Sequence, residues 1–502
     1  MPQSPEIFKN VEKDWSDYLR DESRMPGRAD SISFAVTEDG MIRHILVAGE
    51  NNLRVTVQGA RTGIVAGAVP DGGHILNLSR MTEISSVKRD GNLCSVMVQP
   101  GVILSTLRER VEKETEGKFF FPPDPTETSA SIGGMVASNA SGACSFSYGP
   151  TRNHVNALRV VLADGNTLSL RRGQCLAEGR SFSLKTEQGR VISGNLPSYV
   201  MPDVKNSAGY FVKDNMDLID LFIGSEGTLG VVSEIEIGLT PSPSAVWAMM
   251  AFLPGDREAL EFVTEIRGGN YRPSAMEFFD VNALNLLRRM KNDNPAFKDL
   301  PEMPSSWNTG VYIEYHAGDD NEADTALEEI SRIMIERGGN DETAWLATEE
   351  KEMSKLKDFR HAVPEAVNLL VDQRRKKEAG LTKLGTDFSV PDNRLEEAME
   401  FYRGDLEREG LEYVIFGHIG NNHVHVNILP DSIAGYRRGK ELYRSWARRV
   451  VEMGGSVSAE HGVGKLKKEL LLEMYGEKGI NEMKALKNLF DPKGILNPGN
   501  MW

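Results

Sequence analysis

Short apolar runs bounded by glycine, proline and asparagine recur through the first half of the chain, which is the pattern of strands joined by turns. We expect strands at 53–57, 157–163 and 231–237, and a helix at 42–50. Residues 1–30 are polar and charged, and we expect them to be partly helical up to a breaker formed by methionine, proline and glycine.

The second half of the chain alternates strands with longer helices. Strands are expected at 246–252 and 310–316, and helices at 257–267 and 322–337. This order predicts an α+β fold built around an antiparallel sheet. The charged segment 325–360 has periodic apolar positions and is expected to be a solvated amphipathic helix followed by loops.

One boundary is clear in the sequence. The run Thr240-Pro241-Ser242-Pro243-Ser244 has the composition of a linker. Residues 1–240 are therefore expected to form one unit.

A run of small residues at 131–142 carries the first functional signal. It follows a turn stiffened by Pro122, Pro123 and Pro125 and presents almost no side-chain bulk. Paired glycines let a backbone pass close to a flat or phosphorylated ligand, and free N–H groups beside hydroxyls form a nest for pyrophosphate. A tight loop buried for packing is the alternative, but the length and order of the segment count against it.

A second glycine-rich loop, Gly59-Ala60-Arg61-Thr62-Gly63, follows the strand expected at 53–57. Such a loop at the end of a strand suits a phosphate group, and taken alone it is equally compatible with a simple turn. It lacks the spacing of a P-loop, and no G-x-G-x-x-G follows a strand, so a nicotinamide site has no support.

Composition narrows the class of protein. A chain of 502 residues corresponds to about three domain-sized units. The formal net charge of −15 argues against a nucleic-acid surface and against strong attraction to anionic lipid. Three widely spaced cysteines argue against a disulfide framework, a zinc knuckle or an internal iron–sulfur cluster.

The first residues contain no apolar core of a signal peptide. No apolar run approaches the roughly 18 residues that a membrane span needs. We therefore expect a cytoplasmic protein without a membrane span.

Four of the nine histidines lie within residues 418–461. The apolar and aromatic run 413–416 and the alternating run 423–428 flank a segment of turn composition at 419–422. This order predicts a β-hairpin.

Strand alternation puts His423, His425 and Asn427 on one face of the second strand. With the turn as predicted, His418 lies on the same face opposite His423, so two imidazoles can converge. Glu460, in the segment SAEHGVGK, offers a carboxylate. Two histidines and one carboxylate suit catalytic zinc or a similar divalent ion, and also non-haem iron. Histidines that merely hydrogen-bond across the hairpin are an equally good interpretation of the spacing.

The segment PPDPTETSASIGGMVASNASG resembles the flavin-binding segment of the vanillyl-alcohol oxidase / p-cresol methylhydroxylase superfamily. It is most similar to the branch of FAD-linked 2-hydroxy-acid dehydrogenases, which includes D-lactate, glycolate and D-2-hydroxyglutarate dehydrogenases. Further motifs follow in the order of that family: the loop 59–63, PDVKNSAGY, FIGSEGTLG, GHIGNNHVHVN, SAEHGVGK and FDPKGILNPGN. The resemblance runs from about residue 24 to the end of the chain.

The resemblance implies a two-part FAD-binding domain of the p-cresol methylhydroxylase (PCMH) type at 1–240. It implies an α+β substrate (cap) domain with an antiparallel sheet at 241–458, and a C-terminal segment at 459–502 that returns to the flavin domain. The residues that it implies for FAD contact are Gly59, Ala60, Arg61, Thr62, Gly63, Pro123, Asp124, Ser131, Gly133, Gly134, Ser138, Asn139, Gly142, Glu226, Gly230 and Asn497.

The same resemblance assigns the chemistry. The residues that match His418, His425 and Glu460 hold a metal in the family. The histidine that matches His461 is the general base, and the residue that matches Asn427 contacts the substrate. A divalent cation lowers the pKa of the substrate hydroxyl, the histidine takes its proton, and the flavin accepts the hydride.

By resemblance, Arg360 clamps the substrate carboxylate, and Lys383 is a weaker candidate. This chain departs from the family at His423, where asparagine is usual. The 2-hydroxyglutarate enzymes carry threonine where this chain has Pro364 and lysine where it has Gly385. The second carboxylate of 2-hydroxyglutarate thus loses its partners, which favours a short monocarboxylate such as lactate or glycolate.

The expected function is FAD-dependent oxidation of a D-lactate-like 2-hydroxy acid to the 2-oxo acid. Electrons would pass to a quinone, an electron-transfer flavoprotein or an iron–sulfur subunit. One alternative is a metal-free, FAD-dependent alcohol oxidase of the same superfamily. A second is a zinc hydrolase, which would leave residues 57–235 without a role. No nucleic-acid partner is expected, and a homodimer is compatible with the sequence.

Overall fold

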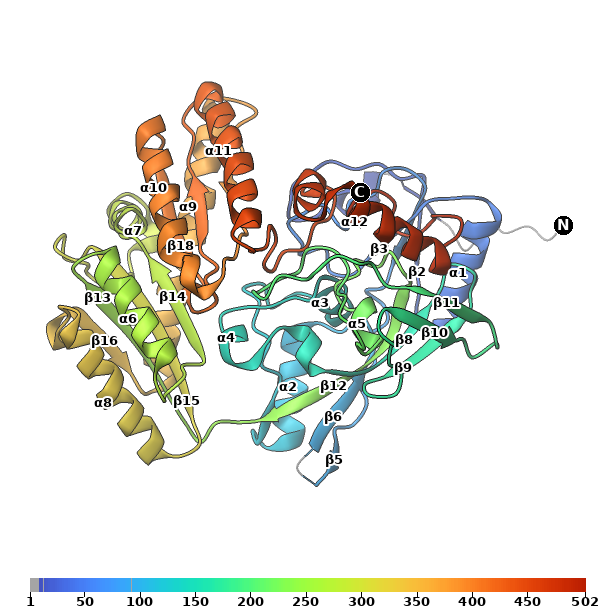
Figure 1. Cartoon of the computed structure of the whole chain (residues 1–502), viewed down its shortest axis with the longest axis horizontal. Coiled ribbons are helices and arrows are strands. Elements are labelled where there is room, and N and C mark those ends of the chain that lie inside the picture. Colours follow the sequence, from blue (N-terminus) through green and yellow to red (C-terminus); the bar gives the residue numbers. More distant parts are fainter. Residues whose placement is uncertain (1–8, 12, 92) are drawn as a thin grey trace.

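The chain builds two groups of sheets, which are joined where strand β12 passes into strand β13 (Figure 1). The computed structural model describes residues 9–11, 13–91 and 93–502. Of the helix predicted within 1–30, a 3-10 helix is present at η1 (Lys13–Leu19), and residues 1–8 and 12 lie outside the described residues.

A four-stranded sheet with the order β1-β2-β4-β3 opens the fold. Strands β2 and β3 run parallel to β4, and α1 (Glu38–Glu50) makes the crossover between β2 and β3. The side chain of Thr37 caps α1 by accepting a hydrogen bond from the Gly40 N–H, so the predicted helix is confirmed and begins four residues earlier. The strands are β1 (Lys9–Asn10), β2 (Ser31–Phe34), β3 (Val55–Gln58) and β4 (His74–Asn77).

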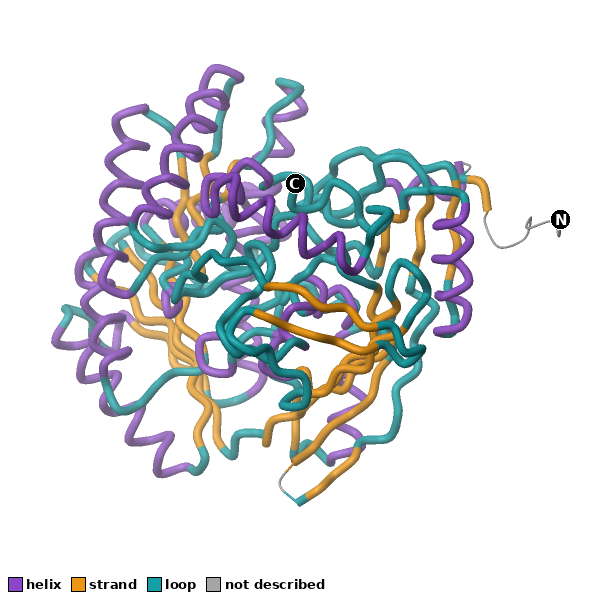
Figure 2. The backbone as a smooth tube through the Cα atoms, turned by 45° about the vertical axis from the view of Figure 1, so that its right-hand side comes forward, coloured by secondary structure: helices purple, strands orange, loops and turns teal. Residues whose placement is uncertain are grey.

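An antiparallel sheet with the order β5-β6-β12-β8-β9 follows, and β7 pairs with β12. Alternate residues of β12 are buried, because one face of the sheet covers the core. The strands are β5 (Lys88–Asp90), β6 (Leu93–Val98), β7 (Phe119–Phe120), β8 (Val155–Val161), β9 (Thr167–Arg171) and β12 (Val231–Pro241). A separate hairpin is formed by β10 (Ser181–Lys185) and β11 (Val191–Asn195). The helices on this side are α2 (Leu104–Thr115), α3 (Ile132–Ser138), α4 (Ser145–Tyr148), η2 (Thr151–His154) and α5 (Ile219–Phe222), and loops make up much of the rest (Figure 2).

The second group is one antiparallel sheet with the order β16-β13-β15-β14-β18-β19-β17. Both of its faces are covered by helices, so β13 reads as a continuous apolar run. Met249 and Ala251 pack into one core cluster, whereas Met250 and Phe252 pack into another. The strands are β13 (Ala245–Leu253), β14 (Ala275–Phe279), β15 (Thr309–Ala317), β16 (Ala344–Ala347), β17 (Leu384–Gly385), β18 (Tyr413–Gly417) and β19 (His425–Ile428). The helices are α6 (Asp256–Gly268), α7 (Val281–Asp293), η3 (Pro295–Phe297), α8 (Asp320–Glu336), η4 (Asp341–Thr343), α9 (Glu350–Lys377), η5 (Asp392–Arg394), α10 (Leu395–Glu409), η6 (Ile419–Asn421) and α11 (Ile433–Glu452). The α+β prediction is therefore confirmed.

The end of the chain returns to the N-terminal sheets (Figure 1). Helix α12 (Lys468–Phe490), which bends at Gly476, packs against both α11 and β11. Beyond it the Val55 N–H donates to the Ile495 carbonyl, and the Asn497 N–H donates to the Val55 carbonyl. The last residues thus extend the edge of β3.

One local prediction was wrong, and two helical segments were not predicted. The small-residue run 131–142, for which no helix was predicted, contains the short helix α3, because the Ser131 side chain caps it. The segment 325–360 does not end in loops but contains β16 and the start of α9. The basic run at 374–377 is the last turn of α9, where positive charge is favourable.

Among the described residues, none of the helices combines the length and the apolar character that a membrane span needs.

A buried ion pair anchors the returning segment. Lys487 Nζ lies 2.9 Å from Asp491 Oδ2 and also donates to the carbonyls of Thr228 and Leu496, and Asp491 is wholly buried. The substitution Lys487→Met leaves that carboxylate without its cation, and we expect it to lower the free energy of unfolding by about 3–5 kcal/mol in a urea titration. Lys478→Met, on the exposed face of the same helix, is the matched control and should cost less than about 0.5 kcal/mol. Equal effects of the two substitutions would contradict this role for Lys487.

Candidate functional site

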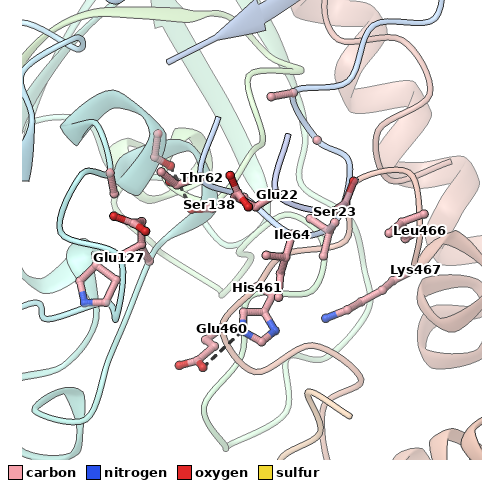
Figure 3. A pocket seen from close by; sticks show the side chains of 18 of the residues that line it. Glu22, Ser23, Thr62, Ile64, Glu127, Ser138, Glu460, His461, Leu466 and Lys467 are labelled. Carbon is pink, nitrogen blue, oxygen red and sulfur yellow. Dashed lines mark hydrogen bonds and ion pairs between the residues drawn. The ribbon is translucent and has the colours of Figure 1, made fainter. Parts of the chain in front are cut away.

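A cavity of about 1320 Å³ lies between the two groups of sheets. Its wall is made by the loop after β3, by the segment around α3 and by α9 and the hairpin β18–β19. Figure 3 shows Thr62 and Ser138 on one side of this pocket and Glu460 with His461 on the other. The volume exceeds that of a typical single-ligand pocket, about 300–1,000 Å³, so a large cofactor and a small molecule can share it.

Small residues form the N-terminal wall of the cavity. Ser131 Oγ accepts hydrogen bonds from the N–H groups of Ala60 and Gly134, at 3.2 Å and 3.3 Å, and so ties the loop after β3 to the start of α3. A Cβ on Gly59 would lie 2.1 Å from Ser131 Oγ, so only glycine permits this approach. Of the residues that the sequence predicted for cofactor contact, those that line the cavity are Gly59, Ala60, Arg61, Thr62, Gly63, Asp124, Ser131, Gly133, Gly134, Ser138, Gly142, Glu226, Gly230 and Asn497.

Two of the predicted cofactor residues, Pro123 and Asn139, are not part of this wall. The Pro123 carbonyl accepts a hydrogen bond from Arg108. Asn139 ends α3 with a left-handed φ of 50°, and its Oδ1 accepts the Arg152 N–H. Both residues therefore contact other parts of the protein instead of the cavity.

The hairpin and the segment that follows α11 bring the three predicted metal ligands to one point. His418 Nε2 lies 3.2 Å, and His425 Nε2 3.4 Å, from Glu460 Oε1. The hairpin has the predicted register, since Phe416 pairs with His425, but β19 begins only at His425, so His423 precedes the strand.

A second partner orients each of the two imidazoles. His418 Nδ1 lies 2.6 Å from Glu277 Oε1 on β14, and His425 Nδ1 lies 3.0 Å from the Thr386 carbonyl. With the proton on Nδ1 in each ring, both Nε2 atoms can offer a lone pair to a cation held beside Glu460 Oε1. Metal-binding histidines in proteins are held in this way, so the donor set fits a divalent cation.

The other carboxylate oxygen of Glu460, Oε2, faces the N-terminal group of sheets. Lys205 Nζ lies 2.6 Å and Ser141 Oγ 3.2 Å from Glu460 Oε2. Burial raises the pKa of Glu460, but His418 and Lys205 outweigh it and hold the pKa well below its ordinary value. Burial lowers the pKa of His418, but Glu277 and Glu460 outweigh it and raise the pKa to about 9. The site therefore keeps its carboxylate ionised.

His461 stands beside the cluster and faces the cavity. Its Nε2 lies 3.5 Å from Glu460 Oε1, and its Nδ1 lies 3.3 Å from Asp387 Oδ2. Asp387 is buried and accepts the backbone N–H groups of Glu460 and His461 as well as the Lys467 ammonium. Asp387 thus fixes both the loop and the ring of His461.

Arg360, on α9, brings a largely buried positive charge to the cavity, with its side chain 13% exposed. Its nearest ion-pair contact among the described residues is Glu277 Oε1 at 4.0 Å, beyond hydrogen-bond distance. Burial lowers the pKa of Arg360, but Glu277 and Asp124 outweigh it and raise the pKa. A buried guanidinium without a hydrogen-bonded carboxylate is a site for an anionic group of a ligand.

Asn427 and Lys383 also line the cavity. Asn427 is buried on β19, and a Cβ on Gly385 would lie 2.8 Å from its Oδ1, so glycine leaves room for this amide. Lys383 lies just before β17 with an exposed side chain.

Glu226 and Asn497 serve the backbone more than a ligand. Glu226 Oε1 accepts the N–H groups of Val463 and Gly464, which fixes the loop that carries His461. Asn497 bridges the Val57 N–H and the Glu226 carbonyl, both at 2.7 Å.

Sequence reasoning missed Glu277, Lys205, Thr386 and Asp387. Glu277 lies 141 positions from His418, and Lys205 lies 255 positions from Glu460, so no local spacing connects them. The signal that was available is a charged residue inside an otherwise apolar strand or a small-residue motif, as in AMEFF and PDVKNSAGY.

Comparison with known proteins adds an independent result. Residues 242–501 match the family described as "FAD linked oxidases, C-terminal domain", and residues 29–171 match the family described as "FAD binding domain". The chain is 27% identical to a D-lactate dehydrogenase of Anaerostipes hadrus, over 97% of this chain and 92% of that protein. It is 30% identical to a mitochondrial D-2-hydroxyglutarate dehydrogenase of Bos taurus, over 99% of this chain and 80% of that protein.

Among solved structures, the fold is similar to that of a 4-ethylphenol oxidase from Gulosibacter chungangensis. The TM-score is 0.67 at 17% identity, over 98% of this chain and 93% of that chain. The similarity supports the PCMH-type arrangement of the sheets.

The close approach of Gly59 to Ser131 gives a test of the small-residue wall. Overpacking a tight contact costs about 1–3 kcal/mol, so we expect Gly59→Ala to raise the dissociation constant for FAD about 10- to 100-fold. Gly63→Ala, in the same loop, is the matched control, because a Cβ there meets nothing within 4 Å. Fluorescence titration of the stripped protein with FAD measures both constants. An unchanged constant for Gly59→Ala would show that this approach does not shape the cofactor site.

Proposed function

The chain belongs to the family of FAD-linked oxidases, and we propose that it uses FAD to oxidise a short 2-hydroxy acid to the corresponding 2-oxo acid. One observation carries the proposal. A largely buried arginine, a histidine–carboxylate donor set and the half-buried imidazole of His461 converge on the cavity that the small-residue segments also line. A 2-hydroxy acid presents a carboxylate and a neighbouring hydroxyl, which are the groups that this set can recognise.

Each group has a defined task in the proposal. Arg360 binds the substrate carboxylate and sets the position of the α-carbon. His461 accepts the hydroxyl proton at Nε2, while Asp387 holds the ring through Nδ1. Asn427 orients the substrate by a hydrogen bond from its side chain. Lys383 contacts the outer part of the ligand.

The two groups that the protein would bind supply the rest of the chemistry. FAD supplies the two-electron oxidant that takes up the hydride from the α-carbon. A divalent cation, zinc or a similar ion, held by His418, His425 and Glu460, supplies polarisation of the hydroxyl oxygen. The FAD contacts are assigned to the cavity-lining residues of the loop after β3 and of the segment around α3.

We also propose a role for each of the three domains predicted from the sequence. Residues 1–240 would bind FAD, residues 241–458 would bind the substrate, and residues 459–502 would return to the flavin side. The course of the last residues along β3 supports the third part.

A monocarboxylate such as D-lactate is the proposed substrate. Pro364 and Gly385 line the cavity where the 2-hydroxyglutarate enzymes would carry threonine and lysine, so neither of these two positions offers a side-chain donor. The relatives named as D-lactate dehydrogenases support the same class of substrate.

Electrons must leave the reduced flavin for a separate acceptor, and we propose a quinone, an electron-transfer flavoprotein or an iron–sulfur subunit. A cytoplasmic location is proposed from the sequence, although a relative with 30% identity is named as mitochondrial. A homodimer is compatible with the proposal.

The direct test is anaerobic mixing of the flavin-loaded protein with D-lactate, L-lactate, glycolate and D-2-hydroxyglutarate, while the visible flavin band is followed. We expect D-lactate or glycolate to bleach the band and 2-hydroxyglutarate to be the poorer reductant. Prior removal of the metal with a chelator should slow the reduction, and adding back a divalent metal ion should restore it. Reduction at an unchanged rate after chelation would favour the metal-free oxidase. A band that none of the four acids bleaches would overturn the proposed substrate class.

Arg360 gives a second prediction. Hydrogen bonds to charged groups contribute about 1.5–3 kcal/mol each, so loss of a bidentate clamp in Arg360→Met should lower kcat/KM about 10²- to 10⁴-fold, chiefly through KM. The control is Arg375→Met. Arg375 also lines the cavity, but it is exposed and paired with Asp372 at 3.1 Å, so a change below about tenfold is expected. Equal losses in the two variants would remove Arg360 from its proposed role.

A further inference from the structure

His423 is wholly buried against the histidine–carboxylate cluster. Its exposed fraction is 0%, and among the described residues neither ring nitrogen has a hydrogen-bond partner. Nε2 lies 3.0 Å from Asp387 Oδ1, which is an ion-pair distance, but the contact does not meet the geometry of a hydrogen bond. Buried polar atoms without partners are rare, because water has been removed from them without replacement.

We propose that His423 is a third imidazole ligand of the divalent cation, so that this chain forms a centre of three histidines and one glutamate. The proposal rests on the proposed function, since it specifies the metal site on which that function draws. It also concerns a position at which this chain departs from the family resemblance.

The geometry supports a fourth ligand. The ligand atoms of His418, His423, His425 and Glu460 all lie within 4.8 Å of one another. The ring of His423 lies 4.5 Å from that of His425 and 5.3 Å from that of His418, centroid to centroid. A cation that contacts all four would relieve the unpaired nitrogen of His423.

In each of the three imidazoles, one nitrogen would bind the metal and the other would face a protein group. His418 turns Nδ1 to a carboxylate and His425 turns Nδ1 to a carbonyl, which leaves Nε2 for the metal. His423 would use Nε2 toward Asp387 and leave Nδ1 for the metal. A hydrogen-bonded partner on the second nitrogen orients His418 and His425, as is usual for metal-binding histidines, and for His423 the Asp387 carboxylate lies 3.0 Å from Nε2.

The backbone explains why His423 faces inward. Asn422 adopts a left-handed φ of 50°, which asparagine tolerates better than most residues. Its side chain donates to Asp392 at 2.5 Å and accepts from Arg267. The His423 N–H donates to the His418 carbonyl at 3.2 Å. The turn is therefore fixed on both sides of the residue that it presents to the cluster.

A fourth protein ligand changes which metal suits the site. Zinc with four protein ligands is usually tetrahedral and closed. A centre that also takes two oxygens of a hydroxy acid needs six positions, which iron(II), manganese(II) and cobalt(II) occupy readily. We therefore expect the metal site of this chain to prefer an ion that takes six ligands in octahedral geometry over zinc.

The test counts imidazoles directly. The flavin-loaded protein is stripped of metal, reloaded with cobalt(II), and studied by X-ray absorption at the cobalt edge, alongside the variants His423→Asn and His44→Asn. We expect three imidazoles for the wild type and two for His423→Asn, which carries the residue usual in the family. Competition with a chromophoric chelator should show a cobalt affinity at least about tenfold weaker in His423→Asn. His44→Asn, on α1 away from the cluster, should match the wild type in both measurements.

The outcomes separate this inference from the function on which it rests. Two imidazoles in the wild type, or an unchanged imidazole number and affinity in His423→Asn, would overturn the role of His423 and leave the proposed function intact. A wild type that binds no cobalt would overturn the metal site as a whole. The spectrum of the wild type decides the question even where the variant fails to fold.

Discussion

The carboxylate of Glu460 joins the two groups of sheets at the point where the chemistry is proposed. One oxygen faces the imidazoles of His418 and His425, which belong to the seven-stranded sheet and its hairpin. The other oxygen is held by Lys205 and Ser141, which belong to the N-terminal group. Because both oxygens are engaged, the relative position of the two groups fixes the donor set, and the site exists only when they are assembled.

The buried carboxylates Asp387 and Glu226 are stabilised by the hydrogen bonds that they accept. Asp387 collects backbone N–H groups and an ammonium, and Glu226 collects the N–H groups of Val463 and Gly464. Both carboxylates thereby hold the loop that carries His461. Arg360 is different, since its buried guanidinium has no hydrogen-bonded carboxylate among the described residues. Asp387 and Glu226 therefore stabilise the wall of the cavity, whereas Arg360 is available to bind a ligand.

The sequence predicted those parts of the structure that depend on local pattern. The apolar runs of β12 and β13, the linker between them and the hairpin of His418 and His425 all follow from alternation and turn residues. Helix α3 was missed because a Gly-Gly pair disfavours helix, and its cap at Ser131 decided otherwise. Pro364 and the basic run beyond it likewise concealed the length of α9.

The partners of the site residues could not be predicted, because Glu277 and Lys205 reach the cluster only through the tertiary fold. The family resemblance supplied the ligand set, and the structure adds what orients it. The central claim is that hydride leaves the α-carbon of a 2-hydroxy acid for FAD in this cavity. Rapid mixing of the flavin-loaded protein with D-lactate, with and without deuterium at C2, tests it most directly. The account predicts that deuterium slows bleaching of the flavin band several-fold, by a primary isotope effect. Equal rates for the two substrates, or no bleaching by any short 2-hydroxy acid, would contradict it.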